Sequence, residues 1–92
     1  RFALPQPAPA WSGTRDATKF GPVCPQPAGP LRGSGEVSED CLNLNVWTPA
    51  SNRGAKLPVM FWIHGGGFFG GTGATYDGEA LARKGVVVVT IN

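Results

Sequence analysis

The fold is decided by a stretch in which an apolar run leads directly into three consecutive glycines: residues 57–68, LPVMFWIHGGGF. Residues 57–63 are apolar without alternation, which is typical of a strand covered on both faces. Residues 86–91, VVVVTI, are mostly β-branched and predict a second strand of the same kind. Glycines placed directly after a strand allow the backbone to adopt positive φ and to approach a ligand closely. We call residues 64–71 the glycine loop.

A short helix is predicted between these two strands, over residues 77–85. Asp77 can cap its start, Leu81 is expected to pack inward, and Gly85 can adopt the left-handed conformation after its end. The order strand, loop, helix, strand is a βαβ crossover, so the two strands should be parallel neighbours. The chain is therefore predicted to be an α/β protein.

A third strand is predicted before the first two, over residues 41–48. Leu42, Leu44 and Val46 alternate there with polar residues, and this period of two indicates a half-buried strand. We therefore expect three strands in the chain.

Residues 1–40 read as a loop region, because seven prolines remove backbone donors and block regular structure. Composition alone also fits a disordered linker. Five isolated apolar residues favour a loop held on a surface instead: Phe2, Leu4, Trp11, Phe20 and Val23. We expect one small domain over residues 1–92, with a loop region at 1–40 and the strands and glycine loop at 41–92.

The charge pattern gives no sign of a nucleic-acid partner. The formal net charge is +2, and the basic residues are scattered from Arg1 to Lys84 rather than gathered on one element. No apolar run approaches the roughly 20 residues of a membrane span. The sequence has no initiator Met or signal peptide and stops within a strand-like run at Asn92, so we expect a piece of a longer protein.

The two cysteines, Cys24 and Cys41, have no metal-ligand partners near them, and the single histidine, His64, belongs to a different motif. We therefore expect no metal site and no cofactor. The cysteines either form a disulfide or remain free thiols. A disulfide would stabilise the chain by about 3 kcal/mol and would indicate an oxidising compartment, hence a secreted protein.

The glycine loop has three interpretations. Residues 65–70 match the G-x-G-x-x-G pattern of phosphate binding, but a dinucleotide site also needs a helix that begins inside the motif and an acidic residue after the next strand. Here the helix begins near Asp77 and the strand ends in Asn92. Stabilisation of a developing oxyanion fits better, because the α/β-hydrolase arrangement places an HGGG-type segment at this point. A glycine-rich turn with no ligand is the third interpretation.

His64 stands at the end of the predicted strand, beside the three glycines. In the α/β-hydrolase arrangement the catalytic histidine comes last in chain order. We therefore assign His64 a supporting role, in which it holds the loop by hydrogen bonding, rather than the role of general base.

Several segments together resemble the type-B carboxylesterase/lipase family, which includes cholinesterases and para-nitrobenzyl-type esterases. They are Arg1-Phe2 with Trp11-Ser12-Gly13, residues 38–46 (SEDCLNLNV), residues 62–68 (WIHGGGF) and Tyr76-Asp77-Gly78. The resemblance covers essentially the whole chain. It implies an amino-terminal fragment of an α/β-hydrolase fold, with a mixed, mostly parallel sheet and a long disulfide-closed loop.

The resemblance also implies roles for individual residues. Gly66 and Gly67 match the family's oxyanion-hole donors, and Gly65 precedes them in the tight turn. Cys24 and Cys41 match the family's first disulfide. Glu39 matches a structural acid that pairs with an arginine at the position of Arg1, although two unrelated surface charges are the alternative.

The activity implied by the resemblance is hydrolysis of small carboxylic esters by a secreted serine esterase through an acyl-enzyme. No G-x-S-x-G nucleophile elbow occurs in the 92 residues, and the acid and histidine of the triad are absent as well. The site would therefore require the remainder of the same hydrolase chain. A non-catalytic adhesion member of the family is the alternative, and His64 with the intact triple glycine favours the enzyme.

Two further features concern the substrate. Between Cys24 and Cys41 the loop is shorter than in cholinesterases and has no Trp to hold a quaternary ammonium by cation–π contact, which argues against a choline-ester specialist. Phe68, Phe69 and Tyr76 are candidates for an acyl or alcohol pocket, and core packing is the alternative for each of them.

Overall fold

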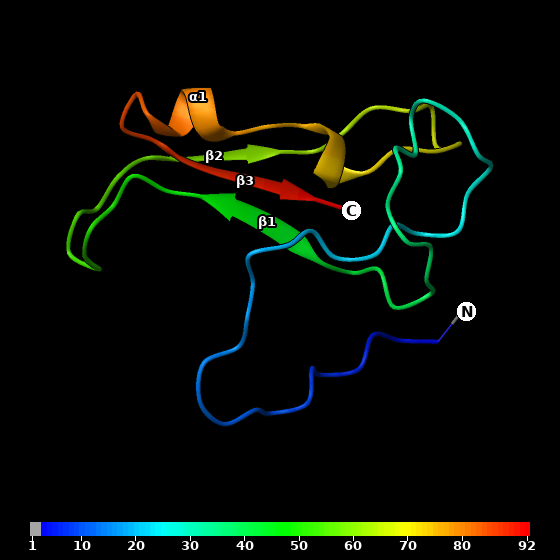
Figure 1. Ribbon diagram of the computed structural model, residues 1–92, viewed down its shortest axis with the longest axis horizontal. Helices are drawn as coiled ribbons and strands as arrows, with labels where there is room; N and C mark the ends of the chain where they lie inside the picture. Colours follow the sequence, from blue (N-terminus) through cyan, green and yellow to red (C-terminus); the bar gives the residue numbers. More distant parts are fainter. Residues whose placement is uncertain (1–2) are drawn as a thin grey trace.

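The computed structural model describes residues 3–92, and three strands form one mixed sheet in the order β1-β3-β2 (Figure 1). The strands are β1 (Leu44–Trp47), β2 (Val59–Trp62) and β3 (Val87–Ile91). The pairing of β2 with β3 is parallel, and the pairing of β1 with β3 is antiparallel. The mixed sheet and the predicted crossover are confirmed.

Two short helices lie between β2 and β3: η1 (Gly73–Thr75), a 3-10 turn, and α1 (Glu79–Ala82). The Asp77 side chain accepts a hydrogen bond from the Glu79 N–H at 2.8 Å, and Gly85 has φ of +91°. The left-handed conformation of Gly85 is confirmed. The N-cap position is occupied by Gly78 rather than by Asp77, which bonds the first turn from one residue further out, and the helix is shorter than residues 77–85. A pair between Glu79 and Arg83 lies on its outer side.

The inward face of α1 differs from the prediction. Ala82 is buried, whereas Leu81 remains 40% exposed, so the inward packing of Leu81 is wrong. A four-residue helix offers a single position to the sheet, and the small side chain of Ala82 allows the close approach.

One face of the sheet is covered. Alternation along β3 places Val88 and Thr90, both buried, on this face, and the register adds Trp47 from β1 and Met60 from β2. Helix α1 and η1 pack against β3. The Trp47 ring lies 6.1 Å from that of Phe20, between ring centroids.

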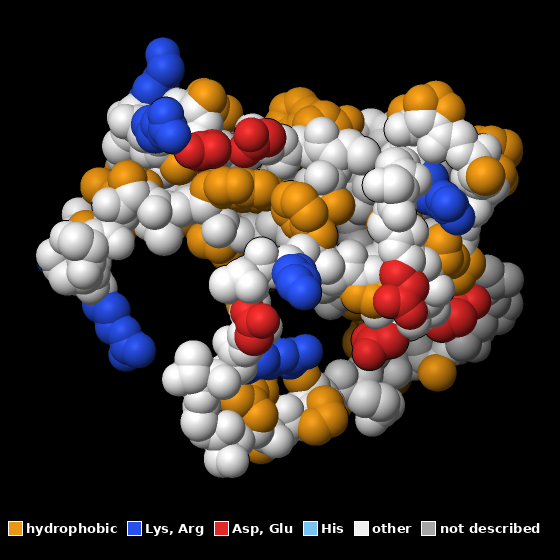
Figure 2. Space-filling model, in the orientation of Figure 1, with side chains coloured by type: hydrophobic (Ala, Val, Ile, Leu, Met, Phe, Trp, Pro, Cys, Tyr) orange, Lys and Arg blue, Asp and Glu red, His pale blue; other side chains and the backbone are white. Residues whose placement is uncertain are grey.

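The opposite face is open. Leu44 and Val46 of β1 and Val59 and Phe61 of β2 lie on this face and are exposed, as is Leu42. Met60 and Trp62, on the covered face of β2, are also exposed, at 43% and 45%. Figure 2 shows exposed hydrophobic side chains over the strands. The prediction that Leu42, Leu44 and Val46 form the buried side of β1 is therefore wrong. The prediction that β2 is covered on both faces is wrong as well. Two-sided burial needs a layer on each face, and residues 3–92 form a layer on one.

Residues 3–40 contain no helix and no strand beyond an isolated parallel bridge between Val23 and Val37. Val23 is buried and anchors this segment, and the partly exposed Phe20 packs against Trp47 of β1. Leu4 and Trp11 are exposed, so their prediction as anchors is wrong; Phe2 lies outside the described residues. Among residues 3–92, no helix has the length and apolar character needed to cross a bilayer.

Candidate active site

The glycine loop begins just after the carboxyl end of β2, beside the parallel strand β3. Gly66 has φ of +135°, Gly67 of +61° and Phe68 of +59°. The Gly66 carbonyl accepts hydrogen bonds from the N–H groups of Phe69, at 2.9 Å, and Gly70, at 3.3 Å. The loop is therefore a tight turn whose tip is Gly67 and Phe68.

Gly66 and Gly67 differ in the space around them. A Cβ at Gly66 would run into the Gly70 carbonyl, whereas a Cβ at Gly67 would meet nothing within 4 Å. Within residues 3–92, neither Gly66 nor Gly67 donates its N–H to another residue. Both amides are thus available to a bound anion or oxyanion.

The His64 ring lies beside this turn. Its Nδ1 lies 2.8 Å from the Gly65 carbonyl oxygen. Because a carbonyl only accepts hydrogen bonds, Nδ1 carries the proton in this contact. The ring also lies against Gly71, where a Cβ would meet it. The role of His64 in holding the loop stays a prediction.

Gln26 is hydrogen-bonded to the other end of the glycine loop, and this contact was not predicted from the sequence. Its Oε1 accepts from the Gly71 N–H at 2.6 Å, and its Nε2 donates to the Gly71 carbonyl at 2.9 Å. The same Nε2 donates to the Cys24 carbonyl at 3.2 Å. One side chain thus connects the glycine loop with the segment that carries the first cysteine.

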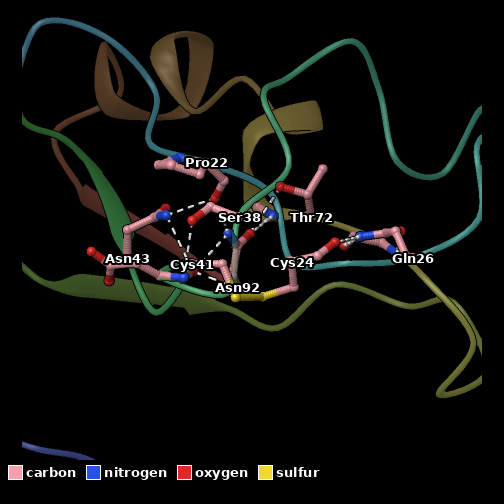
Figure 3. Close-up of a disulfide and its surroundings, with 11 residues drawn as sticks. Pro22, Cys24, Gln26, Ser38, Cys41, Asn43, Thr72 and Asn92 are labelled. Atoms are coloured by element: carbon pink, nitrogen blue, oxygen red, sulfur yellow. Dashed lines mark hydrogen bonds between the residues drawn. A yellow bond between two sulfur atoms is a disulfide. The ribbon is translucent and has the colours of Figure 1, made fainter. Parts of the chain in front are cut away.

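Cys24 and Cys41 form the predicted disulfide, with a Cα–Cα distance of 5.0 Å (Figure 3). The two residues are 17 positions apart, so the bridge closes the loop that contains Gln26. Arg1 lies outside the described residues, and its ion pair with Glu39 therefore stays a prediction.

Asn92 joins the disulfide loop to the segment after the glycine loop (Figure 3). Its Nδ2 donates to the carbonyls of Pro22 and Cys41, each at 3.0 Å. Its Oδ1 accepts from the Thr72 hydroxyl at 2.8 Å and from the Gly73 N–H at 3.0 Å. Its place at the carboxyl end of a parallel strand was the one signal that could have indicated a role near the site.

Asn43 adds to the same network, with Nδ2 at 2.8 Å from the Pro22 carbonyl and 3.1 Å from that of Cys41. The two asparagines therefore share two carbonyl acceptors. This network fixes the disulfide loop against the end of β3.

The aromatic candidates lie in different surroundings. Phe68 and Phe69 project from the tip of the glycine loop and are exposed. The Tyr76 ring packs against Trp62, with 5.3 Å between the centroids. Core packing among residues 3–92 therefore accounts for Tyr76 and not for the two phenylalanines.

The site offers backbone donors rather than a nucleophile or a metal centre. Among the described residues no group of three or more His, Cys, Asp or Glu side chains is placed to hold a metal ion. The chemistry that the backbone of residues 64–71 can supply is hydrogen bonding from N–H groups to a negatively charged atom.

Comparison with known proteins agrees with this geometry. The model of the carboxylesterase family matches residues 1–92. A fumonisin B1 esterase of Sphingopyxis macrogoltabida is 52% identical over 96 residues, which cover 100% of this chain and 18% of that protein. Liver carboxylesterase 1 of Oryctolagus cuniculus is 47% identical over 105 residues, 99% of this chain and 19% of that protein.

A solved structure of a PNB esterase has a TM-score of 0.70 and 47% sequence identity, and the match covers 80% of this chain and 16% of that one. The strand order, the crossover and this likeness define part of an α/β-hydrolase fold. The chain belongs to the carboxylesterase family. It spans less than a fifth of the length of these curated relatives.

Proposed function

We propose that this chain is the oxyanion-hole segment of a serine esterase that hydrolyses small carboxylic esters through an acyl-enzyme. Gly66 and Gly67 donate their N–H groups to the tetrahedral intermediate, and Gly65 and His64 support the turn. The observation that carries the proposal is the pair of glycine amides after β2 that donate to no residue among 3–92. The names of the relatives, esterases and carboxylesterases, support the reaction class.

The nucleophile, the acid and the catalytic histidine are proposed to come from the remainder of the same hydrolase chain. The open face of the sheet, with Leu44, Val46, Val59 and Phe61 exposed, supports this part of the proposal, since an apolar face of a sheet is normally buried. The 92 residues by themselves are expected to leave esters intact. The disulfide supports a secreted location.

The proposal is tested with the full-length protein that carries this chain and with p-nitrophenyl acetate as the substrate. The variant is Gly67→Ala, and the matched control is Gly13→Ala, since both glycines have φ between +60° and +75° and no atom within 4 Å of an added Cβ. The methyl group strains the left-handed backbone at either position, but at Gly67 it also moves an oxyanion donor.

We expect Gly67→Ala to lower kcat at least about tenfold, a part of the 10²–10³-fold effect of losing such a donor. Gly13→Ala should keep the wild-type rate. An unmodified protein that hydrolyses no ester would contradict the proposal and favour a non-catalytic binding member of the family. Equal rates for the two variants would contradict the role of Gly67.

A further inference from the structure

We propose that Gln26 is a positioning residue for the esterase reaction: its side-chain amide holds the Gly71 peptide and thereby fixes the glycine loop that carries Gly66 and Gly67. This inference rests on the proposed function, because the loop orients an oxyanion only in a chain that hydrolyses esters. Gln26 itself touches no reacting atom in this account.

The contact between Gln26 and Gly71 is two-pointed. The side-chain oxygen accepts from the backbone N–H, and the side-chain nitrogen donates to the carbonyl of the same residue. This pairing fixes which way the amide points, since a reversed amide would set NH₂ against N–H and oxygen against oxygen. The third bond, to the Cys24 carbonyl, fixes Gln26 on its own segment.

Gly71 is the point at which the glycine loop is held from both sides. The His64 ring and the Gly65 carbonyl lie against one side of its α-carbon, where a Cβ would meet them. The Gln26 amide pairs with its peptide groups. A Cβ at Gly70 would meet Gln26 Oε1 at 2.7 Å, so the preceding residue also lies against this side chain.

The turn transmits this constraint to the donors. Gly70 donates to the Gly66 carbonyl, so the end of the loop that Gln26 holds is hydrogen-bonded to the residue just before the tip. Three consecutive glycines have wide conformational freedom, and an oxyanion hole depends on donors fixed in advance. Gln26 comes from 45 positions away and removes that freedom without occupying the site.

The test uses the full-length protein with p-nitrophenyl acetate, and active sites are counted by reaction with a fluorophosphonate. The variants are Gln26→Glu and Gln26→Met, and the matched controls are Gln6→Glu and Gln6→Met. Gln6 is exposed, and among residues 3–92 its side chain bonds only to the carbonyl of Leu4, two positions away, at 3.3 Å. In Gln26→Glu a carboxylate oxygen faces the carbonyls of Gly71 and Cys24, and protonation restores one donor.

We expect kcat per active site to fall about tenfold or more in both Gln26 variants at pH 8, with KM nearly unchanged, as for a weakened oxyanion hole. The deficit of Gln26→Glu relative to the unmodified protein should shrink as the pH falls toward 5, and that of Gln26→Met should not. Both Gln6 variants should match the unmodified protein.

Wild-type kcat per active site in both Gln26 variants would overturn the inference, even if fewer molecules fold, because a merely structural role changes the number of sites and not their rate. Lack of hydrolysis by the unmodified protein would be a different result, since it would remove the proposed function itself and the inference with it.

Discussion

Asn92, the residue after β3, and Thr72, the residue before η1, are joined by a hydrogen bond of 2.8 Å from the Thr72 hydroxyl to the Asn92 side-chain oxygen. The Thr72 hydroxyl in turn accepts from the Ala74 N–H at 3.2 Å and so caps η1. Thr72 is buried. The end of the central strand is thereby tied to the segment that leaves the glycine loop.

The first prediction concerns Asn92→Asp. A carboxylate still accepts from Thr72 and Gly73, but its second oxygen faces the carbonyls of Pro22 and Cys41 and donates to neither. We expect the free energy of unfolding to fall by about 1–3 kcal/mol, because two carbonyls lose the Asn92 donor, keep only that of Asn43 among side-chain amides, and face a carboxylate oxygen instead. Urea unfolding measures the change.

Asn52→Asp is the control for Asn92→Asp. The Asn52 oxygen accepts from the Gly54 N–H at 2.9 Å, and Asp preserves that bond. Equal stabilities for the two variants would show that the Asn92 network contributes nothing.

Gly73→Ala tests the packing between η1 and β3. A Cβ at Gly73 would lie 2.7 Å from the Ile91 carbonyl oxygen, which is backbone and cannot move aside. We expect a loss of about 1–3 kcal/mol in the free energy of unfolding, as for other overpacked positions. Gly29→Ala, with no atom within 4 Å of the added Cβ, should leave the stability unchanged. A stable Gly73→Ala would contradict the close approach.

The disulfide should stabilise the chain mainly by restricting its unfolded state. Replacing Cys24 and Cys41 together by Ser is expected to lower the free energy of unfolding by about 3 kcal/mol, the entropy of closing a loop of this length. Non-reducing peptide mapping verifies the bridge, and denaturant titration measures the loss. Free thiols on separate Cys24 and Cys41 peptides would contradict the structure.

The pKa of Asp16 is held below its ordinary value, chiefly by a hydrogen bond from the Thr18 hydroxyl at 2.7 Å and also by one from the Thr18 N–H. Thr18→Val should raise this pKa toward the ordinary Asp value, and Thr14→Val should not. Because folding lowers the pKa of Asp16, its ionised carboxylate favours the folded state at any pH above its unfolded pKa. This contribution to the free energy of unfolding disappears as the pH falls through the folded pKa. NMR titration of Asp16 checks the shift, and an unchanged pKa in Thr18→Val would refute this cause.

Local and periodic signals predicted part of this arrangement. The crossover from β2 to β3 followed from two apolar runs with a helix between them. Asp77 marked the start of the helix through its side-chain acceptor, and Gly85 marked the end through its positive φ. Leu81 was predicted inside because it is large and apolar. Burial depends on which layer covers an element, and periodicity does not contain that information.

The long-range partners of Gln26 and Asn92 could not be predicted from the sequence, for a related reason. Gln26 bonds a residue 45 positions away, and Asn92 bonds Pro22 70 positions away. No spacing of residues in the sequence predicts such contacts, because they form only when the disulfide loop packs onto the end of the sheet. The glycine loop, by contrast, was visible as a motif, since its chemistry lies in consecutive backbone groups.

The central claim, that the N–H of Gly67 stabilises the oxyanion, is tested most directly by replacing that N–H with an ester oxygen in the full-length protein. The matched control is an ester at residue 70, which removes one bond to the Gly66 carbonyl and so weakens the same turn while both proposed donors remain. We expect kcat/KM for p-nitrophenyl acetate to fall about 10²–10³-fold for the ester at residue 67, and far less for the control. Equal losses for the two esters would contradict the role of the Gly67 N–H.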